Sequence, residues 1–135
     1  MTVESLRRQL DVLNNAYIPH KISFKLRGAD SVVMPSWSTN CLEFSTKQNL
    51  RKGTYADLNV YFFPKLGCID GNRVLWYEKF FGYSAFPWQL AAGDGNEVMD
   101  GVLVRSDTVP GSDSEKNLGM TLIHEVGHWF GRKYS

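Results

Sequence analysis

The chain has 135 residues, of which 43% are hydrophobic and 21% charged, a composition that fits one domain with a packed core. Fifteen Lys and Arg nearly balance fourteen Asp and Glu, so the net charge of +1 argues against nucleic acid or an anionic membrane as a partner. No run approaches the roughly 18 apolar residues of a membrane span, and charged residues interrupt the N-terminal stretch where a signal peptide would be apolar.

Two helices and one strand are predicted in the first half of the chain. Leucines at helical spacing predict an amphipathic helix over Val3–Asn15, which Pro19 ends. Hydrophobic and polar residues alternate over Lys21–Arg27, a pattern typical of a half-buried strand. Glu43–Leu50 is predicted as a second helix, with Gly53 in a C-cap role.

Three strands and a last helix are predicted in the second half. Leu58–Phe63, rich in β-branched and aromatic residues, is the clearest central strand. Gly82–Trp88 is a short strand that Pro87 restricts to the edge of a sheet, and Gly101–Val109 is another strand. A helix over Leu118–Gly131 follows. Without internal repeats or a linker, this order of helices and strands predicts one layered α/β domain.

The last predicted helix holds the motif His-Glu-x-x-His, formed by His124, Glu125 and His128. Residues four apart lie one turn apart on the same side of a helix, so both imidazoles are able to reach one metal ion. Zinc suits such a site because it lowers the pKa of bound water to about 7 and polarises a peptide carbonyl. The sequence therefore predicts a Zn2+ site with His124 and His128 as metal ligands and Glu125 as the catalytic base.

A helical wheel separates the two histidines from the buried face of this helix. Five apolar residues form one continuous arc, and His124 and His128 lie nearly opposite its middle. Thr121, Glu125 and Gly127 are the other residues of the histidine face, which lacks the Lys and Glu of an ordinary exposed surface. We therefore expect this face to line a cleft. The apolar arc consists of Leu122, Ile123, Val126, Trp129 and Phe130.

A third metal ligand is harder to assign. In the longer pattern His-Glu-x-x-His-x-x-Gly-x-x-His, the Gly allows a turn that returns a third His to the metal. Gly131 stands at the right offset, but Tyr134 occupies the position of the third His. A phenol with a pKa of about 10 is an uncommon zinc ligand. His20, at the start of a predicted strand, is interpreted as an ordinary polar residue far from the site.

The two cysteines leave the compartment open. Cys41 and Cys68 could form one disulfide in an oxidising environment or remain two buried thiols. A zinc role is less favoured because the chain has no Cys-x-x-Cys pair.

The run Gly119–Gly131 resembles the active-site helix of pappalysin-type metzincins, the family of pregnancy-associated plasma protein-A, and in particular its small secreted fungal metalloproteases. The resemblance covers most of the chain, with Lys65–Phe81 the least familiar part. Its other segments are Val12–Tyr17, Ile22–Phe24, Leu58–Tyr61, Gly82–Trp88, Asp100–Val102 and Pro110–Ser112.

This resemblance implies a secreted zinc metalloendopeptidase whose upper subdomain has a twisted, mixed sheet backed by the N-terminal helix and the active-site helix. Its edge strand, near Gly82–Trp88, would bind an extended segment of a peptide or protein substrate. His124 and His128 would hold zinc, Glu125 would be the general base and acid, and Gly131 the turn. We expect a monomer, with neither nucleic acid nor a membrane as partner.

The chain departs from the family pattern after Gly131, where a third His, a Met-turn and a lower subdomain would follow. Residues 1–135 are therefore expected to form a single catalytic upper subdomain, truncated at the C-terminus and without a signal peptide. The first prediction is peptide-bond hydrolysis by zinc-activated water with a Glu general base, at an incomplete site. The alternative is a catalytically impaired fragment or non-catalytic relative that keeps at most weak zinc or peptide binding.

Overall fold

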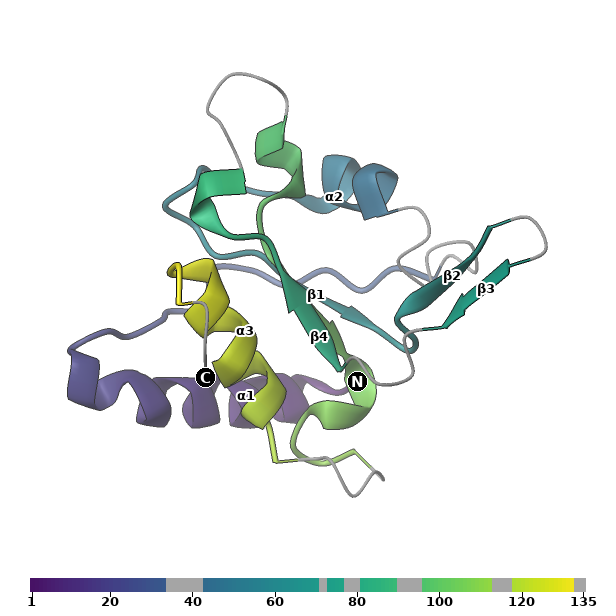
Figure 1. Ribbon diagram of the computed structural model, residues 1–135. Coiled ribbons are helices and arrows are strands. Elements are labelled where there is room, and N and C mark those ends of the chain that lie inside the picture. Colours follow the sequence, from purple (N-terminus) through teal and green to yellow (C-terminus); the bar gives the residue numbers. More distant parts are fainter. Residues whose placement is uncertain (34–42, 71–72, 77–80, 90–95, 113–117, 133–135) are drawn as a thin grey trace.

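The computed structural model describes residues 1–33, 43–70, 73–76, 81–89, 96–112 and 118–132. None of the helices in these ranges is long and apolar enough to cross a membrane. The elements, in chain order, are α1 (Val3–Tyr17), α2 (Glu43–Leu50), β1 (Val60–Phe63), β2 (Gly67–Asp70), β3 (Arg73–Trp76), β4 (Gly82–Ser84), β5 (Val102–Arg105) and α3 (Met120–Trp129) (Figure 1).

The main sheet has the strand order β1-β5-β4. β1 runs parallel to β5, with Val60 opposite Val102, and β4 runs antiparallel to β5, with Tyr83 opposite Leu103. β4 therefore lies at an edge of this sheet, as predicted for this segment. The strand is shorter than the predicted Gly82–Trp88, because it ends at Ser84 and Pro87 begins a short 3-10 helix. The mixed sheet and its helices confirm the α/β class.

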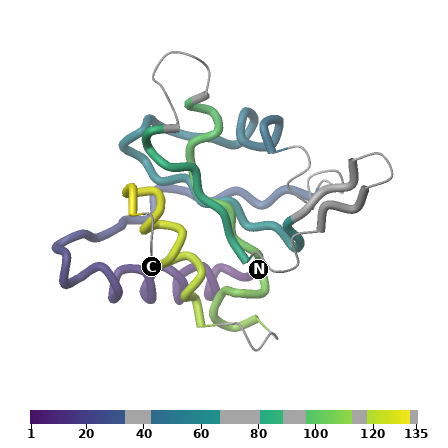
Figure 2. Tube along the Cα trace, viewed as in Figure 1, coloured from purple at the N-terminus to yellow at the C-terminus, as the bar shows by residue number. Residues whose placement is uncertain are grey.

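One core lies between this sheet and α3. Val102 and Val104 of β5 form a buried cluster there with Leu122 and Val126 of α3 and with Leu13 of α1. α1 packs against α3, and the two helices lie side by side in the Cα trace, α1 in purple and α3 in yellow (Figure 2). Full burial of a side chain such as Leu122 contributes about 2 kcal/mol to folding. The helix with the motif is thus held from both sides by apolar packing.

A second core covers the opposite face of the sheet. Leu103 of β5 is buried with Tyr61, Phe63 and Leu66, and Leu50 of α2 packs against this cluster. β5 has buried side chains on both faces, which explains its unbroken apolar run Val-Leu-Val.

α1 confirms the predicted N-terminal helix and extends two residues further, to Tyr17. Thr2 caps it, because its hydroxyl oxygen accepts a hydrogen bond from the Ser5 amide at 3.1 Å. The buried residues Ser5, Gln9 and Leu13 lie four apart and so share the face that meets α3.

The strand predicted at Lys21–Arg27 is wrong, since these residues form no strand in the structure. A short 3-10 helix, Ile18–His20, ends at Lys21, whose φ of 58° is left-handed and turns the chain. The side chain of Asn14 then binds both backbone groups of Phe24: Oδ1 accepts from its amide at 2.7 Å, and Nδ2 donates to its carbonyl at 3.0 Å. The alternating pattern therefore reflects partial burial without a neighbouring strand.

Two smaller features also differ from expectation. β2 and β3 form an antiparallel pair, with Gly67 opposite Trp76, where no elements were predicted. α2 has the predicted bounds, but Gly53 does not cap it directly. Its φ of 81° belongs to a turn beyond the helix, in which the Asp57 carboxylate accepts a hydrogen bond from the Thr54 amide at 2.9 Å.

Candidate metal centre

The position of α3 is fixed at its start by α1. Gly119 precedes the helix with a left-handed φ of 73°. Its carbonyl accepts a hydrogen bond from Gln9 Nε2 at 3.1 Å, and the Tyr17 hydroxyl donates to the Ile123 carbonyl at 3.1 Å. Because Gln9 is only 2% exposed, its bond is shielded from water. The first half of α3 therefore cannot shift without breaking buried contacts.

The predicted division of α3 into two faces is largely confirmed. Leu122 and Val126 are buried, whereas His124 is exposed and His128 half-buried. Phe130, just past the helix, is 47% exposed and is the weakest member of the apolar arc. The correction concerns Glu125, which the wheel placed on the exposed face.

The two imidazoles of the motif face each other. Nε2 of His124 lies 2.8 Å from Nε2 of His128, and the ring planes are nearly perpendicular, at 88°. The other nitrogen of His128, Nδ1, lies 2.5 Å from the carbonyl oxygen of Arg132. A carbonyl oxygen only accepts hydrogen bonds, so Nδ1 carries a proton, and with one proton on the ring Nε2, which faces His124, is the nitrogen that bears the lone pair. This is the tautomer a metal ligand needs.

Gly131 makes that second contact of His128 possible. Its φ of 96° turns the chain at the end of α3, and its amide donates to the His128 carbonyl at 2.8 Å. The turn brings the Arg132 carbonyl oxygen back to Nδ1 of the His128 ring. Gly131 thus has the turning role predicted for it from the sequence.

His124 is biased toward its neutral form. Partial burial lowers its pKa, and the nearby His128 and Arg132 lower it further. A neutral imidazole binds a metal ion, whereas a protonated one does not.

Glu125 is buried against the sheet. It is 7% exposed, and this burial raises its pKa to about 7, although the proximity of His128 lowers it in part. A carboxyl group with a pKa near neutrality exchanges protons readily at physiological pH, as general acid-base chemistry requires. A cation held by the two histidines would lower this pKa.

Gly82 is what allows Glu125 to lie this close to the edge strand. A Cβ atom at Gly82 would lie 2.7 Å from Cγ of Glu125, 2.9 Å from Cγ2 of Thr121 and 3.0 Å from the Leu103 carbonyl oxygen. Only a residue without a side chain fits between β4 and α3 here. The side chain of Glu125 therefore lies directly against the backbone of β4.

A cavity of about 410 Å³ opens beside the histidine pair. His20 lies in its wall together with His124 and His128, so the prediction that His20 lies far from the site is wrong. The 3-10 helix after α1 carries His20 there, and only knowledge of the packing of α1 on α3 could have placed it. The remaining lining residues are Ala16, Tyr17, Met120, Ile123, Gly127 and Arg132.

Aromatic residues after β4 form another wall of the site, which sequence reasoning did not identify. The ring of Phe86 lies 5.1 Å from that of His128 in an edge-on arrangement. Trp88 stacks on Phe86 at 4.6 Å, with the planes 11° apart. The segment after the edge strand therefore packs directly on the histidine face.

The described residues supply two ligands that suit a metal ion. Two imidazole nitrogens converge, and one is oriented by a hydrogen bond to a carbonyl, as is common for zinc-binding histidines. Within the described ranges, no group of three His, Cys, Asp or Glu side chains is arranged to hold a metal. Tyr134, at the position of the third ligand, lies outside those ranges, as does Cys41. The roles of His124, Glu125 and His128 therefore remain predictions.

Comparison with known proteins gives relatives in fungi. An extracellular metalloprotease of Colletotrichum graminicola is 45% identical over 128 residues, which are 94% of this chain. One from Sordaria macrospora is 39% identical over 97% of the chain, and extracellular metalloprotease 1 of Coccidioides posadasii is 40% identical over 95%. No protein-family model and no solved structure matches the sequence.

The chain spans about two fifths of the length of these relatives, 42% to 43%. The similarity nevertheless covers nearly all of the chain, including the motif helix. This chain is therefore similar, over almost its whole length, to part of the fungal proteins named extracellular metalloproteases.

Proposed function

We propose that this chain is the upper subdomain of a secreted zinc metalloendopeptidase of the pappalysin type. The single observation that carries the proposal is the pair of imidazole nitrogens 2.8 Å apart. Glu125 lies on the same helix, and burial raises the pKa of its carboxyl group to about 7. The relatives named extracellular metalloproteases support both the chemistry and a location outside the cell.

His124 and His128 would hold the metal through Nε2. Bound zinc would polarise the scissile carbonyl and make a water molecule more acidic at neutral pH. Arg132, through its carbonyl, would hold the proton of His128 on Nδ1 and leave Nε2 as the ligand atom. Glu125 would take a proton from the attacking water and deliver it to the leaving amine, and its burial keeps competing solvent away from the carboxyl group.

The substrate would be a peptide or protein bound in extended form along β4. This strand lies at the edge of the sheet, next to α3. An added strand would pair with its backbone and pass Glu125, which lies against Gly82. Phe86 and Trp88 would border the bound peptide on the histidine side.

A second candidate is a relative with impaired catalysis that retains only weak zinc or peptide binding. The observation that favours it is the pair of ligands without a third partner among the described residues. Catalytic zinc sites normally use three protein ligands, so two histidines alone would bind zinc weakly.

A peptide-cleavage assay separates the two candidates. The purified chain, supplied with zinc, is incubated with a library of unstructured peptides, beside Glu125→Gln and Tyr134→His variants. Cleavage that is lost in Glu125→Gln supports the enzyme. Cleavage that arises only in Tyr134→His supports the impaired relative and assigns the defect to the third ligand. An absence of cleavage in both the chain and Tyr134→His would overturn the proposed activity for this chain.

A further inference from the structure

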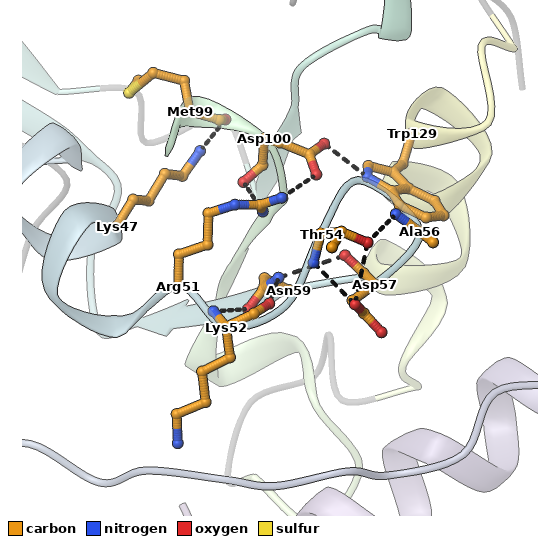
Figure 3. A network of polar contacts seen from close by, with 10 residues as sticks. All are labelled: Lys47, Arg51, Lys52, Thr54, Ala56, Asp57, Asn59, Met99, Asp100 and Trp129. Atoms are coloured by element: carbon orange, nitrogen blue, oxygen red, sulfur yellow. Dashed lines mark hydrogen bonds and ion pairs between the residues drawn. The ribbon is translucent and has the colours of Figure 1, made fainter. Parts of the chain in front are cut away.

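A buried carboxylate ties the end of α3 to the sheet. Asp100 lies just before β5 and is 4% exposed. Its Oδ1 accepts a hydrogen bond from Nε1 of Trp129, the last residue of α3, at 2.9 Å. Figure 3 shows Asp100 between this indole and the side chain of Arg51.

Arg51 compensates the charge of this carboxylate. Its Nη2 lies 3.2 Å from Oδ2 of Asp100, an ion pair that lacks hydrogen-bond geometry, and its Nη1 donates to the Asp100 carbonyl at 3.4 Å (Figure 3). The two side chains are only 10% and 5% exposed. A buried charge is tolerated only with such partners, so Arg51 helps to hold the Asp100 carboxylate in place beside Trp129.

The last turn of α3 is closed by backbone hydrogen bonds, since the amides of Phe130, Gly131 and Arg132 donate to the carbonyls of Val126, His128 and Gly127 at 3.1, 2.8 and 2.9 Å. These bonds lie within the turn, so its orientation against the sheet depends on side-chain contacts with other elements. α1 holds the first half of α3 through Gln9 and Tyr17, but His128 lies in the last turn, directly before Trp129. The bond from Trp129 to Asp100 joins this turn to the start of the central strand.

We propose that Asp100 is a positioning residue for the metal centre. Through Trp129 it fixes the rotation of the last turn of α3 and so keeps Nε2 of His128 directed at Nε2 of His124. The proposal rests on the proposed function for its effect on metal affinity, but the orientation of the His128 ring can be measured without any metal.

Three variants of the full chain test the proposal. Trp129→Phe keeps an aromatic ring in the core but removes the donor. Asp100→Asn keeps an oxygen that accepts from Trp129 while it removes the charge. Phe63→Leu is the matched control, because it loosens the core on the other face of the sheet and leaves α3 untouched.

Two readouts are taken on each variant. Zinc affinity is measured by competition with a chelator, and the tautomer of His128 is read from long-range nitrogen–proton spectra of the metal-free chain. Trp129→Phe should bind zinc about tenfold more weakly, the range seen when groups that orient a ligand are removed. It should also lose the Nδ1-protonated form of His128. Asp100→Asn should stay within about threefold of the wild type, and Phe63→Leu should lose stability but not affinity.

Wild-type spectra and affinity in Trp129→Phe would overturn the proposal, as would an equal loss of affinity in Phe63→Leu. A wild-type chain whose zinc binding is unaffected by His124→Ala refutes the proposed metal centre instead. In that case the nitrogen spectra decide alone: an unchanged His128 tautomer in Trp129→Phe overturns the positioning role, and a changed one supports it.

Discussion

Replacement of Gly82 by alanine tests whether Glu125 is held by close packing of α3 against the edge strand. Gly82 lies in β4 without a left-handed φ, so alanine is compatible with its backbone. The added Cβ would lie 2.7 Å from Cγ of Glu125 and 2.9 Å from Cγ2 of Thr121. Since side chains do not approach so closely, α3 must move away from β4 or Glu125 must change its rotamer.

Gly82→Ala should destabilise the fold because it overpacks the contact between β4 and α3. An extra methyl group in a tight interior typically costs about 1–3 kcal/mol of stability. For a chain of 135 residues this lowers the thermal midpoint by roughly 3–10 °C. Glu125 would be displaced by the same contact, so any peptide cleavage should fall more than tenfold, because a catalytic group displaced by about 1 Å loses that much.

Urea unfolding of the metal-free chain provides the assay, and two variants make it specific. Gly28→Ala is the matched control, because a Cβ there would meet nothing within 4 Å, and its stability should stay within about 0.5 kcal/mol of the wild type. Thr121→Ser removes one of the clashing atoms, so in combination with Gly82→Ala it should recover part of the loss. A Gly82→Ala chain as stable as the Gly28→Ala chain would refute the close packing.

Three further substitutions give distinct results. Burial raises the pKa of Tyr61 to about 12, and its hydroxyl has no hydrogen-bond partner among the described residues, so Tyr61→Phe should cost nothing at pH 7 in urea unfolding. Because the folded pKa lies above the unfolded value of 10, the wild type should lose about 2 kcal/mol more stability than Tyr61→Phe as the pH rises from 10 to 12; parallel pH profiles would contradict this. Asn14→Ala should destabilise the chain by about 1–3 kcal/mol and expose the Phe24 amide to hydrogen exchange, and unchanged exchange would contradict the two bonds to Phe24. Gly127→Ala should raise stability by about 0.5–1 kcal/mol in urea unfolding, since its Cβ would make only ordinary contacts at 3.6 Å within a helix; a loss would show hidden crowding.

The sequence predicted those parts of the fold that depend on local periodicity. The 3.6-residue spacing in α1 and α3 and the apolar run of β5 identified these elements, because each buries one face or both faces in a continuous core. The motif placed His124 and His128 together, since their distance is fixed by one turn of a single helix.

The predictions that were wrong concern residues whose structure depends on contacts between distant segments. The pattern at Lys21–Arg27 is that of a strand, but the Asn14 side chain binds the backbone of Phe24 there. Glu125 falls on the outer face of an isolated helix and becomes buried only because Gly82 lets β4 approach. Neither effect is encoded in the neighbouring residues, so periodicity alone could not reveal it.

The metal centre is tested most directly by titration of the metal-free chain with Co2+, whose absorption spectrum reports coordination by imidazole nitrogen. We predict one ion per chain, with the signal lost in both His124→Ala and His128→Ala and retained in His20→Ala. Zn2+ should displace the Co2+, as expected of a site that suits both metals. A titration with no saturable signal, or a signal that survives the loss of both His124 and His128, would contradict the central claim.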